Sequence, residues 1–273
     1  MRLAMLDGAC DLHVHCAPDV RERRTTALEL ARAARDAGMS ALLLKNHEFS
    51  TVALAATVSE ALDGFPVFGG IVLNEAVGSL NVTAVEIALR MGAKEVWMPT
   101  HCACHERTFR GRPGTGISIL DAQGKVLPDV QEICRLVAAH NAVLGTAHLS
   151  PREIHALVRT AREHHVRTVI ITHPEITFLN LSIDFQKELA GPDILFERCF
   201  VRPLFALDWD GLAASIRAVG IDTTMLATDL GQPENPHPVA GLAEMRAQLS
   251  QRGFTISELD LMLRLNALKA LAL

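Results

Sequence analysis

Short apolar runs alternate with longer amphipathic segments along the whole chain. Eight of these runs are rich in branched side chains, and we expect each to form a buried strand. They cover residues 9–15, 41–46, 66–74, 94–100, 142–148, 167–173, 193–199 and 223–229. Between the runs, apolar positions recur at helical spacing. Strands that alternate regularly with helices are typical of a parallel sheet with crossover helices.

The intervening segments carry the start and stop signals of helices. Thr26-Ala-Leu-Glu29 and Ser150-Pro-Arg-Glu153 are capping boxes, and Gly38, Gly92 and Gly220 follow helical stretches. We expect helices near 26–37, 51–62, 81–91, 129–140, 151–164, 182–190, 209–219, 239–252 and 257–273. The pattern predicts an α/β protein.

Eight strand–helix units in 273 residues predict a distorted (β/α)8 TIM barrel, for which about 250 residues are typical. A doubly wound open sheet is the alternative, but no GxGxxG or GxxxxGK motif follows any predicted strand. No linker divides the chain. We therefore expect residues 1–273 to form a single (β/α)8 barrel domain.

One connection is much longer than the others. About 27 residues separate Thr100 from Pro128, and they contain His101-Cys-Ala-Cys-His105, a Gly/Pro/Arg stretch and a hairpin-like segment at 117–127. Long loops in compact domains are usually functional. We predict a flap over the barrel mouth, after the fourth strand.

The composition of the chain limits the classes of molecule that it is expected to bind. The chain is 49% hydrophobic with a formal net charge of −5 and scattered basic residues, which argues against nucleic-acid or anionic-membrane binding. A small-molecule substrate is the expected partner, and a homo-oligomer stays open. Met1–Gly8 is too short for a signal segment, and no apolar run approaches the roughly 18 residues of a membrane span. Six cysteines without a secretory signal read as reduced thiols, so we expect a cytoplasmic protein.

Every predicted strand ends near a side chain capable of metal ligation or proton transfer. In chain order these are His13 and His15, Lys45 and His47, Asn74 and Glu75, His101, His148, His173, Glu197 and Asp229. In a barrel the carboxyl ends of the strands converge at one mouth, where such enzymes hold their active sites. We therefore expect these side chains to surround one cavity.

Five of them form a set that suits a metal. His13 and His15 share a strand face, with Cα atoms about 6.5 to 7 Å apart. Imidazole nitrogen and carboxylate oxygen are ligands for zinc and similar ions. Alone, each residue has an ordinary explanation: the His-x-His pair could be a hydrogen-bonded pair, and Asp229 could cap a turn. Together, the metal ligands we predict are His13, His15, His148, His173 and Asp229.

The same five residues resemble the amidohydrolase superfamily of metal-dependent hydrolases. That family has His-x-His at strand 1, histidines after strands 5 and 6, and an aspartate after strand 8. The ending Asn266-Ala-Leu-Lys-Ala-Leu-Ala-Leu273 is also similar to the family's Asn-Pro-Ala-x-x-Leu-Gly-Leu, with alanine where proline is usual. The resemblance implies a hydrolase with one or two divalent ions, zinc expected, and Asp229 as the catalytic residue that handles the proton.

The sequence also departs from that family. Binuclear members commonly bridge their metals with a carboxylated lysine or a glutamate from strand 4, and the end of EVWMPTH has neither. Lys45 on strand 2 could bind substrate, bridge metals, or pair with Glu48 or Glu75. His47 and Glu75 are similar to ligands of the PHP phosphoesterases. The substrate-binding residues we predict are Lys45, His47, His101, His105 and Glu197.

We thus expect hydrolysis of a small amide, cyclic amide or lactone by an ion-activated water. The alternatives are a PHP-like phosphoesterase, a decarboxylase, or a non-catalytic metal-binding barrel. Arg21, Arg23 and Arg24 follow the His-x-His motif, and Arg198 and Arg202 flank strand 7. Guanidinium groups near the mouth would suit a carboxylate or phosphate on the substrate, and surface ion pairs explain any one of them equally well.

Overall fold

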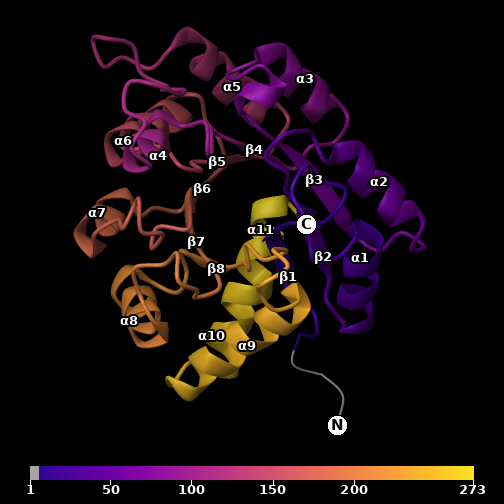
Figure 1. Cartoon of the computed structure of the whole chain (residues 1–273). Coiled ribbons are helices and arrows are strands. Elements are labelled where there is room, and N and C mark those ends of the chain that lie inside the picture. The colour runs from indigo at the N-terminus through magenta and orange to yellow at the C-terminus, as the bar shows by residue number, and fades with distance from the viewer. Residues whose placement is uncertain (1–5) are drawn as a thin grey trace.

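A computed structural model describes residues 6–273, so most of the Met1–Gly8 segment lies outside the described residues. Eight parallel strands follow one another in chain order around a nearly closed barrel (Figure 1). They are β1 (Cys10–Val14), β2 (Ala41–Leu44), β3 (Val67–Val72), β4 (Glu95–Trp97), β5 (Val143–Gly145), β6 (Thr168–Thr172), β7 (Ile194–Arg198) and β8 (Thr224–Leu226). Each falls within a predicted run, so the (β/α)8 fold is confirmed.

The barrel closes just beyond β8. There Val14 pairs in parallel with Leu230, the His15 N–H donates to the Leu230 carbonyl over 2.8 Å, and the Asp229 N–H donates to the His13 carbonyl over 2.7 Å. These bonds bring the end of the last strand against the end of the first. The two ends of the predicted metal set are therefore joined through the backbone.

Helices cover the outside of the barrel (Figure 1). They are α1 (Ala27–Asp36), α2 (Val52–Glu60), α3 (Val82–Arg90), α4 (Cys104–Phe109), α5 (Pro128–Ala139), α6 (Pro151–Glu163), α7 (Ile183–Leu189), α8 (Trp209–Val219), α9 (Pro238–Gln251), α10 (Ile256–Asp260) and α11 (Asn266–Leu271), with a 3-10 turn η1 (Glu75–Val77) and a π-helical turn η2 (Leu261–Leu265). Both predicted capping boxes are formed, at α1 and α6. The expected helix over 257–273 is divided by η2.

Apolar side chains fill the layer between strands and helices, whereas the interior of the barrel also holds polar groups. Lys45, Glu95 and Glu197 are almost inaccessible to solvent. Burial raises the pKa of Glu95 well above its usual value. Burying ionisable groups in this way costs folding free energy, which indicates that these groups serve a purpose other than stability.

The long connection after β4 is only partly a loose flap. It contains the unpredicted helix α4 and a short hairpin in which Leu120 pairs with Val126. Ile119 is fully buried, and the Glu153 side chain accepts hydrogen bonds from the Ser118 hydroxyl over 2.7 Å and the Ile119 N–H over 3.1 Å. The hairpin half of the segment is thus part of the folded core.

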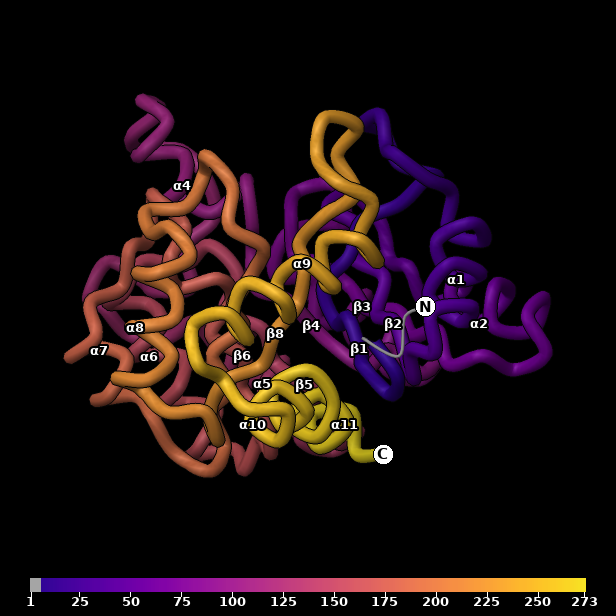
Figure 2. Tube along the Cα trace, turned by 90° about the horizontal axis from the view of Figure 1, so that it is seen from below, coloured from indigo at the N-terminus to yellow at the C-terminus, as the bar shows by residue number. Residues whose placement is uncertain are grey.

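Different elements cover the two ends of the barrel. Figure 2 shows α4 and the connection before α9 on one side, with α10 and α11 on the other. The Asn266 side chain donates to the carbonyls of Ile221 and Thr224, over 3.2 and 2.7 Å, and so ties the tail to the base of β8. Among the described residues, no helix is long and apolar enough to cross a membrane.

Candidate active site

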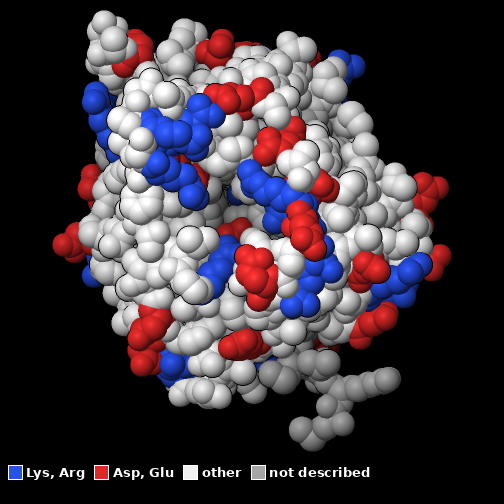
Figure 3. Space-filling model, in the orientation of Figure 1, with Lys and Arg blue, Asp and Glu red and all other residues white. Residues whose placement is uncertain are grey.

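A cavity of about 470 Å³ opens at the carboxyl ends of the strands. Figure 3 shows the hollow on this face, with lysine and arginine side chains gathered around it. Of the predicted site residues, the cavity is lined by His13, His15, Lys45, His47, His101, His148, His173 and Asp229. The strand ends thus converge as expected, and these side chains come from the ends of six different strands.

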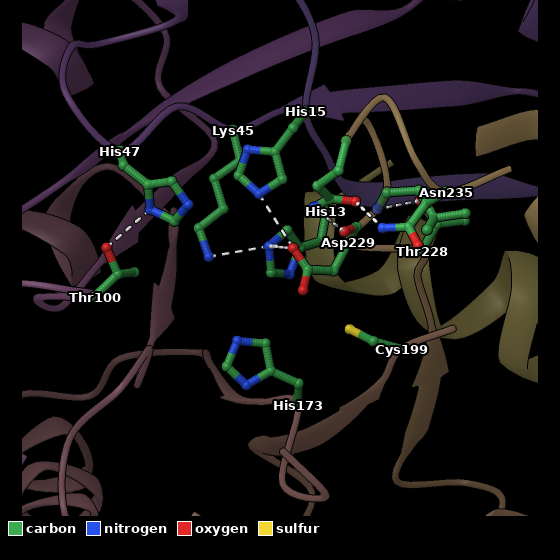
Figure 4. Close-up of polar contacts among 12 residues, drawn as sticks. His13, His15, Lys45, His47, Thr100, His173, Cys199, Thr228, Asp229 and Asn235 are labelled. Carbon is green, nitrogen blue, oxygen red and sulfur yellow. Dashed lines mark hydrogen bonds and ion pairs between the residues drawn. The ribbon is translucent and has the colours of Figure 1, made fainter. Parts of the chain in front are cut away.

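The first group of possible ligands comes from β1 and from the end of β8. His13 Nε2 and His15 Nε2 each lie 3.1 Å from Asp229 Oδ1. Figure 4 shows His15 and Lys45 pointing toward His13 and Asp229, with His173 facing them. Burial lowers the pKa of His15 to about 3, which keeps its ring neutral, and only a neutral imidazole can ligate a metal.

The second group comes from β5 and β6. His148 Nε2 lies 3.2 Å from His173 Nε2, and burial lowers the pKa of both rings. Because His148 Nδ1 bonds to the Glu106 carboxylate, a neutral His148 carries its proton there, and its Nε2 lone pair faces His173 and is available to a metal ion. His173 Nδ1 has no hydrogen-bond partner within the described part of the chain.

Lys45 stands between the two groups. Its Nζ lies 3.1 Å from His13 Nε2 and 5.1 Å from the centre of the Trp97 ring. It does not pair with Glu48 or Glu75, which bind Arg21 and Arg107 instead. Burial lowers the pKa of Lys45, so the ammonium group is more acidic than usual. The ion-pair explanation of this lysine is therefore wrong, and its place in the cavity agrees with contact to a ligand.

Carboxylates behind the histidines orient them. His13 Nδ1 donates to Glu197 over 2.6 Å, and His148 Nδ1 donates to Glu106. Burial lowers the pKa of His13, but Glu197 and Asp229 together outweigh this effect and raise the pKa to about 9. In metal sites such carboxylates set the tautomer so that Nε2 faces the ion. Glu197 and Glu106 are placed to do this here.

The backbone is held in uncommon conformations around the mouth. Ala147, His173 and Asp229 have positive φ values of 49°, 30° and 51°. Gly231 has a φ of 133°, and a Cβ there would lie 2.1 Å from the His15 carbonyl oxygen. Non-glycine residues in this region are uncommon and cluster at functional sites.

The residues fit a divalent ion. Zinc held by nitrogen at about 2.0 to 2.1 Å in tetrahedral geometry separates its ligand atoms by about 3.3 Å. The observed separations of 3.1 and 3.2 Å within the two groups are close to that value. His13, His15 and Asp229 are close enough to hold one ion, and the neutral His148–His173 pair offers a second ligand pair.

Sequence and structure comparisons agree with this architecture. A family model described as "Family of unknown function (DUF6282)" matches residues 8–197, which is more than half of the chain. The chain belongs to the DUF6282 family. The matched region of this DUF6282 protein runs from before β1 into β7 and includes all six histidines that line the cavity. No curated protein matches it.

Solved structures share the fold at low sequence identity. An amidohydrolase of Pseudomonas aeruginosa superposes with a TM-score of 0.68 at 13% identity, covering 97% of this chain and 95% of that one. The probable dipeptidase PvdM of the same organism has a TM-score of 0.68 at 10% identity, covering 96% and 94%. A 2,6-dihydroxybenzoate decarboxylase from Rhizobium has a TM-score of 0.56 at 12% identity, covering 98% and 99%. The predicted resemblance to the amidohydrolase superfamily is confirmed in the fold.

Two of the substrate-binding residues predicted for this DUF6282 protein do not line the cavity. Glu197 is fully buried beneath it, because it faces inward from the middle of the β7–β8 pairing and bonds to His13. His105 lies on α4, and its Nε2 is 2.7 Å from the Phe178 carbonyl oxygen. Helix formation at Cys104 turns this ring away, so of the two flap histidines only His101 reaches the cavity.

Two further expectations are corrected. Glu75, considered as a phosphoesterase-type ligand, is exposed outside the cavity and pairs with Arg107 over 2.8 Å. Arg198 is completely buried with Glu175 and Gln186 rather than at the mouth, because it ends β7 facing the helices. Arg21, Arg23 and Arg202 do line the cavity.

Sequence reasoning missed two acids. Glu106 lies on α4 in the long connection and supports His148, which only the fold reveals. Glu95 begins β4 inside the barrel, where both carboxylate oxygens lack a partner in residues 6–273. A glutamate opening an otherwise apolar strand is a signal that could have pointed to Glu95.

Proposed function

We propose that this protein is a metal-dependent hydrolase that acts on a small amide, cyclic amide or lactone. The observation that carries the proposal is the convergence of four buried histidines and one aspartate, from β1, β5, β6 and the end of β8, on a single cavity. Such a set suits one or two divalent ions, and zinc is the ion we expect from its nitrogen and carboxylate donors.

The chain's own residues supply positioning and proton transfer. When bound, a divalent ion would acidify water and polarise the oxygen of the scissile group. Burial would raise the pKa of Asp229, but Arg202 and the two β1 histidines hold it well below its usual range. Asp229 is therefore ionised at neutral pH. Its carboxylate can accept the proton of the attacking water and return it to the leaving nitrogen or oxygen.

Decarboxylation is the second candidate, because barrels of this shape include the Rhizobium decarboxylase. Replacing a carboxylate on carbon requires a proton donor, whereas Asp229 is held as a base by its ion pair with Arg202. We therefore place hydrolysis first. A cytoplasmic location is part of the same proposal, supported by six free cysteines, five of them buried.

The test begins with the metal. His13→Asn/His15→Asn should lose most of the bound zinc measured by elemental analysis after reloading, because asparagine keeps the size of the side chain and removes the imidazole. The control is His155→Asn/His165→Asn, since both histidines are exposed on or just after α6. Equal zinc content in the two double variants would refute the metal site.

Turnover is then screened with zinc-loaded protein against small lactones, cyclic amides and amides. Hydrolysis that disappears in His13→Asn/His15→Asn and persists in the control is the expected result. Release of carbon dioxide from an acid without hydrolysis of any of these substrates would favour the decarboxylase instead.

A further inference from the structure

The cavity carries an excess of positive charge. It is lined by six cationic side chains and only two carboxylates. The cations are Arg21, Arg23, Lys45, Arg110, Arg112 and Arg202, and the acids are Glu106 and Asp229. The rest of the molecule is net negative, so this local excess is a property of the site (Figure 3).

Four of the arginines are already paired. Arg21 bonds to Glu48 over 3.3 Å, Arg23 to Asp19 over 2.7 Å, Arg110 to Glu106 over 2.5 Å, and Arg202 to Asp229. Such pairs leave little charge for a ligand.

Arg112 is different. Within residues 6–273 it forms no ion pair with a carboxylate, although it lines the cavity and is exposed. A guanidinium group is charged at any physiological pH and presents a planar fork of donors. Arg112 is therefore the arginine of the cavity most available to an anion.

An apolar wall lies beside this charge. It consists of Phe109, Ile176, Phe178 and Leu204. The Phe109 and Phe178 ring centres are 6.1 Å apart, and Phe178 lies 4.8 Å from the His148 ring. Phe109 and Leu204 are 60% and 53% exposed, although both are large apolar residues at a cavity mouth. Exposed apolar surface next to a pocket is typical of a binding site.

We infer that the substrate of this site is a small monocarboxylate with an apolar, ring-sized body. The carboxylate pairs with Arg112 at the rim, and the body packs on the wall formed by Phe109 and Phe178, which leads down to His148. One unpaired guanidinium matches one carboxylate, whereas a phosphate dianion calls for more donors. This inference rests on the proposed function, since it places the scissile group beside the metal ligands.

Binding can be measured by calorimetry with benzoate, phenylacetate and cyclohexanecarboxylate, each beside its neutral amide, and with phenyl phosphate. Metal-free protein is used first, so that direct contact of the acid with zinc does not contribute. We expect each acid to bind at least about tenfold more tightly than its amide, the range of a charge-assisted bond.

Arg112→Ala should remove that preference, and Arg112→Lys should keep part of it. Phe109→Ala should weaken acid and amide alike, because it removes only apolar contact. The control is Arg159→Ala, an exposed arginine of α6 paired with Glu163. Equal binding of acids and amides, an unchanged preference in Arg112→Ala, or a tenfold preference for phenyl phosphate would each overturn the inference.

The result is separable from the proposed function. An Arg112-dependent acid preference in a protein that binds no zinc would support the inference and refute the hydrolase. Zinc binding with hydrolysis of neutral lactones but no acid preference would do the reverse.

Discussion

Asp229 is the residue on which the proposed chemistry depends most. Asp229→Asn preserves shape and one ligating oxygen but cannot accept a proton. We expect the variant to keep its fold and much of its metal, and to lose about 10² to 10⁴ in kcat, the usual contribution of general acid–base catalysis. Steady-state kinetics with parallel metal analysis measures this. Asp208→Asn, at the N-cap of α8, is the matched control. Full kcat with metal bound would reduce Asp229 to a turn cap.

Glu197 acts through His13 rather than on the substrate. Glu197→Gln removes the charge and leaves the ring buried, so the pKa of His13 should fall from about 9 to below its usual 6.5. Nuclear magnetic resonance of the histidine rings in metal-free protein reports it. Glu188→Gln, next to the exposed His155, should leave the pKa of His13 unchanged. A pKa that stays near 9 in Glu197→Gln would show that another group holds the proton.

At the scale of elements, the two capping boxes offer a matched comparison. Glu29 caps α1 alone, whereas Glu153 caps α6 and also accepts hydrogen bonds from Ser118 and Ile119. Glu29→Ala should cost about 1 kcal/mol or less of unfolding free energy. Glu153→Ala should cost about 1 to 3 kcal/mol more, because a buried N–H is left unpaired. Urea denaturation measures both, and equal costs would mean that the hairpin is not anchored by Glu153.

The same anchoring limits what can be cut from the flap. Removing residues 107–124 would delete the fully buried Ile119 together with the cavity side chains Phe109, Arg110 and Arg112. A loss of function after such a deletion could come either from a damaged fold or from lost binding contacts, and the two causes could not be distinguished. Point variants at Phe109 and Arg112 keep the core intact and are the sharper test of this connection.

For the whole molecule, the buried histidines predict how stability depends on pH. Burial lowers the pKa of His15, to about 3, and also lowers those of His47, His148 and His173. In the unfolded chain these rings titrate near their usual value of about 6.5. Below that pH the unfolded state binds more protons, so the free energy of unfolding of metal-free protein should fall as the pH drops from about 6.5 toward 3.

His13 works in the opposite direction. Its raised pKa adds stability that is complete below about 6.5 and is lost as the pH rises through about 9. Stability should therefore be greatest close to neutral pH. Urea denaturation across this range measures the curve, with His47→Asn expected to flatten its acid side and His155→Asn/His165→Asn expected to leave it unchanged. A flat acid side in the native protein would contradict the neutral state of these rings.

The order of strands and helices, the capping boxes at α1 and α6, and the chemical identity of the histidine–aspartate set could all be predicted from the sequence. Each depends on local information: apolar spacing, cap residues, and the rule that parallel strands end at one face of a barrel. His13 and His15 share a face simply because strand side chains alternate.

Only the tertiary structure determined which side chains contact the histidines and the aspartate of this set. Lys45 beside His13, Glu106 under His148 and Glu197 under His13 come from contacts between residues far apart in the chain, which no local pattern records. Helix α4 turns His105 away from the cavity, and the segment after it brings Arg112 to the cavity. The sequence did not predict this helix, because six residues are too few to show a clear helical period. The ligand types were thus local properties, whereas their orientation, their charge and the shape of the cavity were set by packing.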